Sequence, residues 1–160
     1  MRIPFGRCVT GLSLLALSAT ASLAEECSDP SKQAFMVRSL QTELMVAALT
    51  CKIRPDYNTF VSRFKSSLVR NGKVLRSYYK LQFGVESEKH LNAYVTKLAN
   101  KASQRTINAR VDYCDQAKQL FAEVLVSEAG LLATIAADRP SANDSLPPRC
   151  KTAIDVATAN

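Results

Sequence analysis

The sequence is poor in the residues that build most catalytic centres. It has one histidine, His90, no tryptophan, and five glycines among 160 residues. Neither a glycine-rich phosphate loop nor a G-x-S-x-G nucleophile motif occurs. One histidine cannot supply the paired E-x-x-H motifs of a metal site inside a helical bundle. We therefore expect His90 to be a solvated surface residue, and the protein to be non-enzymatic, with no cofactor and no metal ion.

Long apolar runs are also scarce. The longest, residues 11–21, follows Arg2 and Arg7 and precedes the small-x-small sequence Ser22-Leu23-Ala24. This arrangement is typical of a secretion signal. The run is too short to span a bilayer, which takes about 20 apolar residues. The sequence predicts cleavage near Ala24, a periplasmic or secreted location, and no transmembrane span.

The predicted export divides the chain into three parts. Residues 1–24 form the signal peptide, 25–151 a single helical domain, and 152–160 a flexible C-terminal tail. Loss of Arg2 and Arg7 lowers the formal net charge of +7 by two. The mature chain stays basic and has the length of one domain.

Four cysteines remain after Cys8 leaves with the signal peptide: Cys27, Cys51, Cys114 and Cys150. No pair has C-x-x-C spacing, which disfavours a zinc site, a thioredoxin-like redox motif and haem attachment. An even number of cysteines in an exported chain predicts two disulfides.

Apolar residues recur at helical spacing along most of the chain, and no strand-like alternation of useful length occurs. The first helix is apolar on every side between Leu44 and Leu49, which predicts that the other helices surround it. Residues 141–148 are polar and suggest turns. The sequence predicts an all-α fold, a disulfide-stapled antiparallel bundle of about five helices. Their approximate ranges are 32–51, 56–71, 74–83, 87–104 and 114–135.

The disulfide pairing depends on the direction of the helices. A first helix of roughly 20 residues holds its ends about 30 Å apart, which excludes a bond between Cys27 and Cys51. If successive helices alternate in direction, Cys27 pairs with Cys114 and Cys51 with Cys150. If the fourth and fifth helices are continuous, Cys51 pairs with Cys114 and Cys27 with Cys150. We expect the first pairing.

Residues 57–85 contain six basic residues and no acidic one. Such a segment can bind an anionic partner, which in the cell envelope is a phospholipid surface, an acidic glycan or an acidic protein. Export argues against nucleic acid as the partner. The aromatic residues Tyr57, Phe60 and Phe64 recur at helical spacing and are interpreted as core. The candidate binding residues are Arg63, Arg70, Lys73, Arg76 and Lys80.

An alternative hypothesis is a small enzyme or ligand carrier with a pocket inside the bundle. Its candidate residues are Glu43, on the central helix, and Tyr78 or Tyr79. A buried Glu43 requires a partner such as an arginine, because an unpaired buried charge is costly. We expect a structural ion pair at Glu43 rather than a catalytic role.

Three segments carry a resemblance: L-Q-T-E-L-M-V-A-A-L-T-C at 40–51, Y-N-T-F at 57–60 and L-N-A-Y-V-T at 91–96. With the preceding signal peptide they resemble small exported helical proteins of alphaproteobacteria, a group without an assigned activity. The resemblance implies a periplasmic location and supplies no functional residues.

Overall fold

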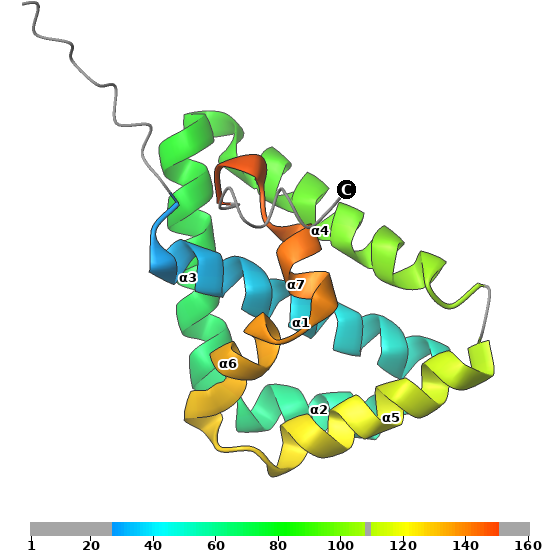
Figure 1. The fold of residues 1–160 in the computed structure, drawn as a ribbon. Helices are drawn as coiled ribbons and strands as arrows, with labels where there is room; N and C mark the ends of the chain where they lie inside the picture. Colours follow the sequence, from blue (N-terminus) through cyan, green and yellow to red (C-terminus); the bar gives the residue numbers. More distant parts are fainter. Residues whose placement is uncertain (1–26, 108–109, 151–160) are drawn as a thin grey trace, which may run out of the picture.

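The computed structural model describes residues 27–107 and 110–150 (Figure 1). The described residues form helices and connecting turns, without a β-strand. Five helices contain ten or more residues, which confirms the predicted all-α bundle. The α-helices are α1 (Asp29–Thr50), α2 (Arg54–Arg63), α3 (Lys65–Phe83), α4 (Ser87–Gln104), α5 (Arg110–Val126), α6 (Leu132–Ala137) and α7 (Pro140–Ser145). Short 3-10 helices lie at Gly84–Glu86, Ala129–Leu131 and Pro148–Cys150.

Helix α1 is the centre of the molecule. It packs against each of the other α-helices of the described chain. Figure 1 shows α3, α4 and α5 around it, with α6 and α7 across one side. Every residue of α1 from Ser31 to Ala48 is buried or half-buried, because the apolar run leaves little polar surface to face water; Leu49, at its end, is 54% exposed. The predicted central position of the first helix is confirmed.

The core consists of two clusters that meet on α1. The C-terminal half of α1 packs with α2, α5 and α6, where Leu44, Phe60 and Phe121 are almost fully buried. The N-terminal half packs with α3 and α4 around Phe35. The ring of Phe35 makes edge contacts with Tyr78 at 5.0 Å and Tyr94 at 5.2 Å between ring centroids.

The second and third helices differ from the prediction. The chain breaks at Phe64, and α3 then runs without interruption through Asn71-Gly72, which the sequence suggested as a helix end. The Asn71 side chain is buried and its Nδ2 donates to the Ser67 carbonyl at 2.9 Å. This hydrogen bond within α3 replaces the expected capping role. The predicted end at Gly84 is confirmed, with φ of 52° in the left-handed region that favours glycine.

The C-terminal part also differs. The fifth helix was expected to continue through Ile135, but α5 ends at Val126 and α6 begins at Leu132. The segment expected to form turns contains α7, which packs on α1. The hydroxyls of Ser39 and Ser145 lie 2.9 Å apart, and Ser145 donates to the Ser141 carbonyl at 2.6 Å. These small buried side chains let α7 approach α1 closely.

Two disulfides close the fold. Cys27 bonds to Cys150, with 4.7 Å between the α-carbons, and Cys51 bonds to Cys114, with 5.5 Å. The expected pairing of Cys27 with Cys114 and Cys51 with Cys150 is therefore wrong, and the alternative pairing is correct.

The error arises from the number of long helices between Cys51 and Cys114. The sequence suggested two rods at 56–71 and 74–83, but α2 is short and α3 is the single long return. Consequently α4 runs along α1 toward its Cys51 end. Tyr94 of α4 lies beside Phe35, and Arg105 at the end of α4 lies beside Glu43. The α5 segment with Cys114 begins there, although α4 and α5 are separate helices.

Removal of the Cys51–Cys114 bond will test this topology. The bond closes a loop with a sequence separation of 63 residues. In the loop-entropy model, replacing both cysteines by serine lowers the free energy of unfolding by about 4 kcal/mol. Urea denaturation measures this loss. Peptide mapping without reduction checks the pairing independently, and a peptide that joins Cys27 to Cys114 would refute it.

Candidate functional site

Helix α3 gathers four of the five predicted binding residues on its solvent side. All are exposed, and Lys65 extends the set at the start of the helix. At 3.6 residues per turn they cover an arc of about 140°. Helix α3 contains no acidic residue. We call this set the basic face of α3: Lys65, Arg70, Lys73, Arg76 and Lys80.

The amphipathic pattern of α3 places these cations outward. Its opposite side buries Ser67, Asn71, Leu75 and Tyr79 against α1 and α4. The neighbouring aromatic residue Phe60 is also fully buried. The interpretation of the aromatic stripe as core is confirmed, so the cations, not the aromatic rings, form the exposed feature.

Arg63, the fifth predicted residue, lies apart from the basic face. It is the last residue of α2, and its Nη2 donates to the Ser127 carbonyl at 2.9 Å. Its guanidinium also lies 6.0 Å from the centre of the Phe64 ring. Arg63 thus connects α2 to the end of α5.

The cations of the basic face are not paired within the described part of the fold. Among the described residues, none of the five forms an ion pair or a side-chain hydrogen bond. Like charges at i,i+3 and i,i+4, such as Arg70 with Lys73 and Arg76 with Lys80, cost a few tenths of a kcal/mol per pair. These cations therefore repel one another along α3 without a compensating ion pair among the described residues.

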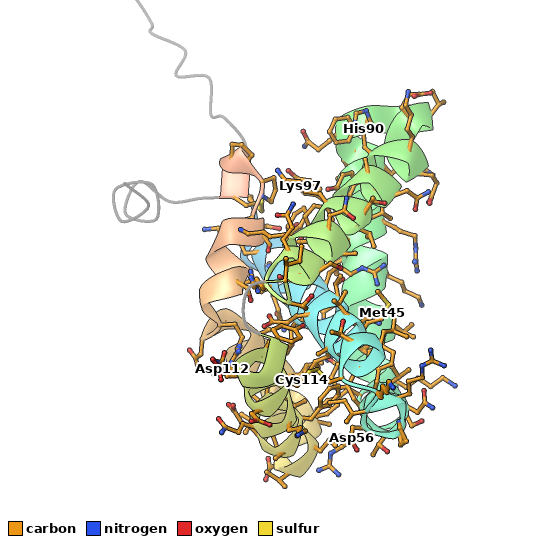
Figure 2. The ribbon with its side chains drawn as sticks, turned by 90° about the vertical axis from the view of Figure 1, so that its right-hand side faces the viewer. Met45, Asp56, His90, Lys97, Asp112 and Cys114 are labelled. Carbon is orange, nitrogen blue, oxygen red and sulfur yellow. A yellow bond between two sulfur atoms is a disulfide. The ribbon has the colours of Figure 1, made fainter. Side chains whose placement is uncertain are left out.

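Exposed apolar side chains lie at the end of the basic face. Leu81 is 83% exposed and Val85 is 99% exposed, at the corner where α3 turns into α4. His90 is exposed at the same corner, and its ring stacks on Phe83 at 3.9 Å between centroids. Figure 2 shows His90 at one end of the molecule and Asp56 at the other. The predicted surface position of His90 is confirmed. Within the described residues no group of three His, Cys, Asp or Glu side chains could hold a metal ion.

A second polar site surrounds Glu43, whose side chain is 14% exposed. Ser141 Oγ donates to Glu43 Oε2 at 2.7 Å. Arg105 Nη1 lies 3.7 Å and Arg139 Nη2 lies 3.8 Å from Glu43 Oε1. Glu43 was expected to have an arginine partner, and it has two, Arg105 and Arg139. The carboxylate links α1 to the end of α4 and to α7.

An open cleft of about 470 Å³ adjoins Glu43. Residues of α5 form one wall, including Asp112, Tyr113 and Leu120. The Tyr113 hydroxyl and Arg139 Nε are buried and have no hydrogen-bond partner among the described residues. Burial raises the pKa of Tyr113, the charge of Glu43 raises it further, and Arg105 acts in the opposite direction.

Tyr78 and Tyr79 do not share this cleft. Both rings contact Phe35, in the other core cluster, and burial raises the pKa of Tyr79. The hypothesis of one pocket around Glu43 and Tyr78 or Tyr79 is therefore corrected: Glu43 lines a cleft with other partners. Those partners, Arg105, Arg139 and Tyr113, were not singled out in the sequence, because no local pattern connects them to Glu43.

Comparisons with family models, with curated proteins and with solved structures find no match to this chain. Within the described parts of the chain, no helix combines the length and apolar character needed to cross a membrane. The two disulfides are typical of proteins in an oxidising compartment outside the cytoplasm.

Replacement of Glu43 by glutamine will measure what the carboxylate contributes. The change removes the carboxylate charge that Arg105 and Arg139 share in a half-buried site. We expect the free energy of unfolding to fall by about 1–2 kcal/mol, less than for a fully buried ion pair because the arginines are partly solvated. Urea denaturation measures the change. Glu123→Gln, at an exposed position of α5, is the matched control. Equal effects of the two variants would contradict a structural role for Glu43.

Proposed function

We propose that this protein is a non-enzymatic periplasmic or secreted module that docks on anionic phospholipid through the basic face of α3. The observation that carries the proposal is a helix face with five exposed cations, no acidic residue and no ion pair among the described residues. Charges that the fold does not use remain available to a partner.

The electrostatic attraction is sufficient for reversible attachment. A basic residue close to an anionic membrane surface contributes about 1 kcal/mol, so the five residues together contribute up to about 5 kcal/mol. The attraction extends over a Debye length of about 8 Å at physiological salt, which makes attachment sensitive to ionic strength.

The apolar corner favours lipid over an acidic protein as the partner. Leu81 and Val85 are exposed at the corner beside Lys80. A membrane interface accepts protruding apolar side chains, whereas a protein partner needs a complementary hollow for them. Burial of one such side chain contributes about 1.5–3 kcal/mol.

The envelope location rests on two arguments. The disulfides require an oxidising compartment. The predicted signal peptide, 1–24, agrees with this location, as does the resemblance to exported alphaproteobacterial proteins. The signal peptide and the tail at 152–160 lie outside the described residues. Export also removes nucleic acid as the partner of the basic face.

Charge reversal on α3 tests the docking surface. The variant carries glutamate at 70, 73, 76 and 80, and its recovery with vesicles of equal parts phosphatidylglycerol and phosphatidylcholine is measured by co-sedimentation. We expect at least a tenfold loss of affinity. A matched control carries four glutamates at other exposed basic positions, Lys52, Arg54, Lys97 and Lys118, and has the same net charge. Equal losses would mean that only net charge matters; unchanged recovery would remove the proposal.

A second experiment tests the apolar corner. Because Leu81 is exposed, Leu81→Ser should leave the free energy of unfolding within about 0.5 kcal/mol of the parent. We expect it to weaken vesicle binding several-fold, and more clearly at 0.5 M salt, where charge attraction is screened. Val126→Ser, at a similarly exposed position on α5, is the control. If Leu81→Ser and Val126→Ser bind alike, the corner does not enter the membrane.

A further inference from the structure

The cleft beside Glu43 has the dimensions of a small-molecule site. Its volume of about 470 Å³ falls within the range of ligand pockets. Four separate segments build it: α1, the end of α4, α5, and the residues that lead into α7. Figure 2 places Asp112, at the start of α5, far from the corner with His90, so the cleft and the docking corner are different places.

The cleft holds more hydrogen-bond donors than the protein itself uses. The closest nitrogens of Arg105 and Arg139 stay 3.7 and 3.8 Å from Glu43 Oε1, which is too far for a good hydrogen bond. Glu43 Oε2 already accepts from Ser141 Oγ. Arg139 Nε and the Tyr113 hydroxyl are buried without a partner among the described residues. Buried polar groups are normally paired, so these donors call for an acceptor.

We propose that this cleft binds a small organic carboxylate, held by Arg105, Arg139 and Tyr113. Guanidinium groups bind planar carboxylates through two parallel hydrogen bonds. A phenol is protonated at neutral pH, and burial raises the pKa of Tyr113 further, so its hydroxyl can donate to an anion.

The remaining lining residues define the rest of the ligand. Ala47, Ala117 and Leu120 supply an apolar surface for a hydrocarbon part. The lining also contains two acidic residues, Glu43 and Asp112, which disfavour a dianion such as phosphate. A carboxylate with a compact apolar body fits this lining.

Binding of a probe to the oxidised, full mature protein tests the proposal. Benzoate is titrated while amide chemical shifts are followed by NMR, with benzamide as the neutral isostere and inorganic phosphate as the competing anion. We expect benzoate to produce saturable shifts in α5 between Asp112 and Leu120, with at least tenfold weaker effects from benzamide and phosphate. Repeating the titration with glutamate and butyrate covers other carboxylate shapes.

The variant Tyr113→Phe separates binding from folding. It removes a hydroxyl that has no partner in the described structure, so the unfolding midpoint in urea should stay the same or rise. Benzoate affinity should nevertheless fall at least about tenfold, as expected for loss of one hydrogen bond to a charged group. The α3 charge-reversal variant should bind benzoate like the parent, which keeps this test separate from vesicle docking.

Three results would overturn the inference. The first is no saturable shift in α5 with any of the three carboxylates. The second is phosphate binding as tight as benzoate binding, which would indicate an adventitious anion site. The third is unchanged benzoate affinity in Tyr113→Phe and in a second variant, Arg139→Gln.

Discussion

The burial of α1 on all sides is the constraint on which the rest of the structure depends. The apolar run at 44–48 has no polar side to turn toward water, so other helices must cover it. Leu40 and Leu44 are almost completely buried, and each contributes about 1.5–3 kcal/mol through the apolar surface removed from water. The two core clusters form where the other helices pack on the two halves of α1. Disulfides then attach Cys27 and Cys51, at opposite ends of α1, to distant parts of the chain.

The same constraint explains where polar chemistry collects. Helix α3 buries one side against α1, so its cations gather on the other side as the basic face. Glu43 is a largely buried charged residue of α1, and Arg105, Arg139 and Ser141 from separate segments lie around its carboxylate. The cleft beside it exists because α4, α5 and α7 meet there. Both candidate sites are thus consequences of packing around one helix.

Local sequence patterns predicted the features that depend on interactions between residues close together in the chain. Helical periodicity gave the all-α fold and the central helix, and amphipathicity placed the cations of α3 outward. Asn71-Gly72 was misread because a hydrogen bond to Ser67 and burial against α1 outweigh its preference for a helix end. Because the break lies at Phe64 instead, α2 is short and α3 is the single long return along α1, so Cys114 lies beside Cys51 rather than Cys27. The arginine partners of Glu43 depend on tertiary packing between segments far apart in the chain, which no periodicity encodes.

Native-state hydrogen exchange tests the central position of α1 most directly. The amides from Leu40 to Ala48 should exchange only through global unfolding, with a free energy equal to that from urea denaturation. Amides of α6 and α7, which cover only one side, should exchange through smaller openings. Exchange of the α1 amides at a lower free energy than those of α5 would contradict the account.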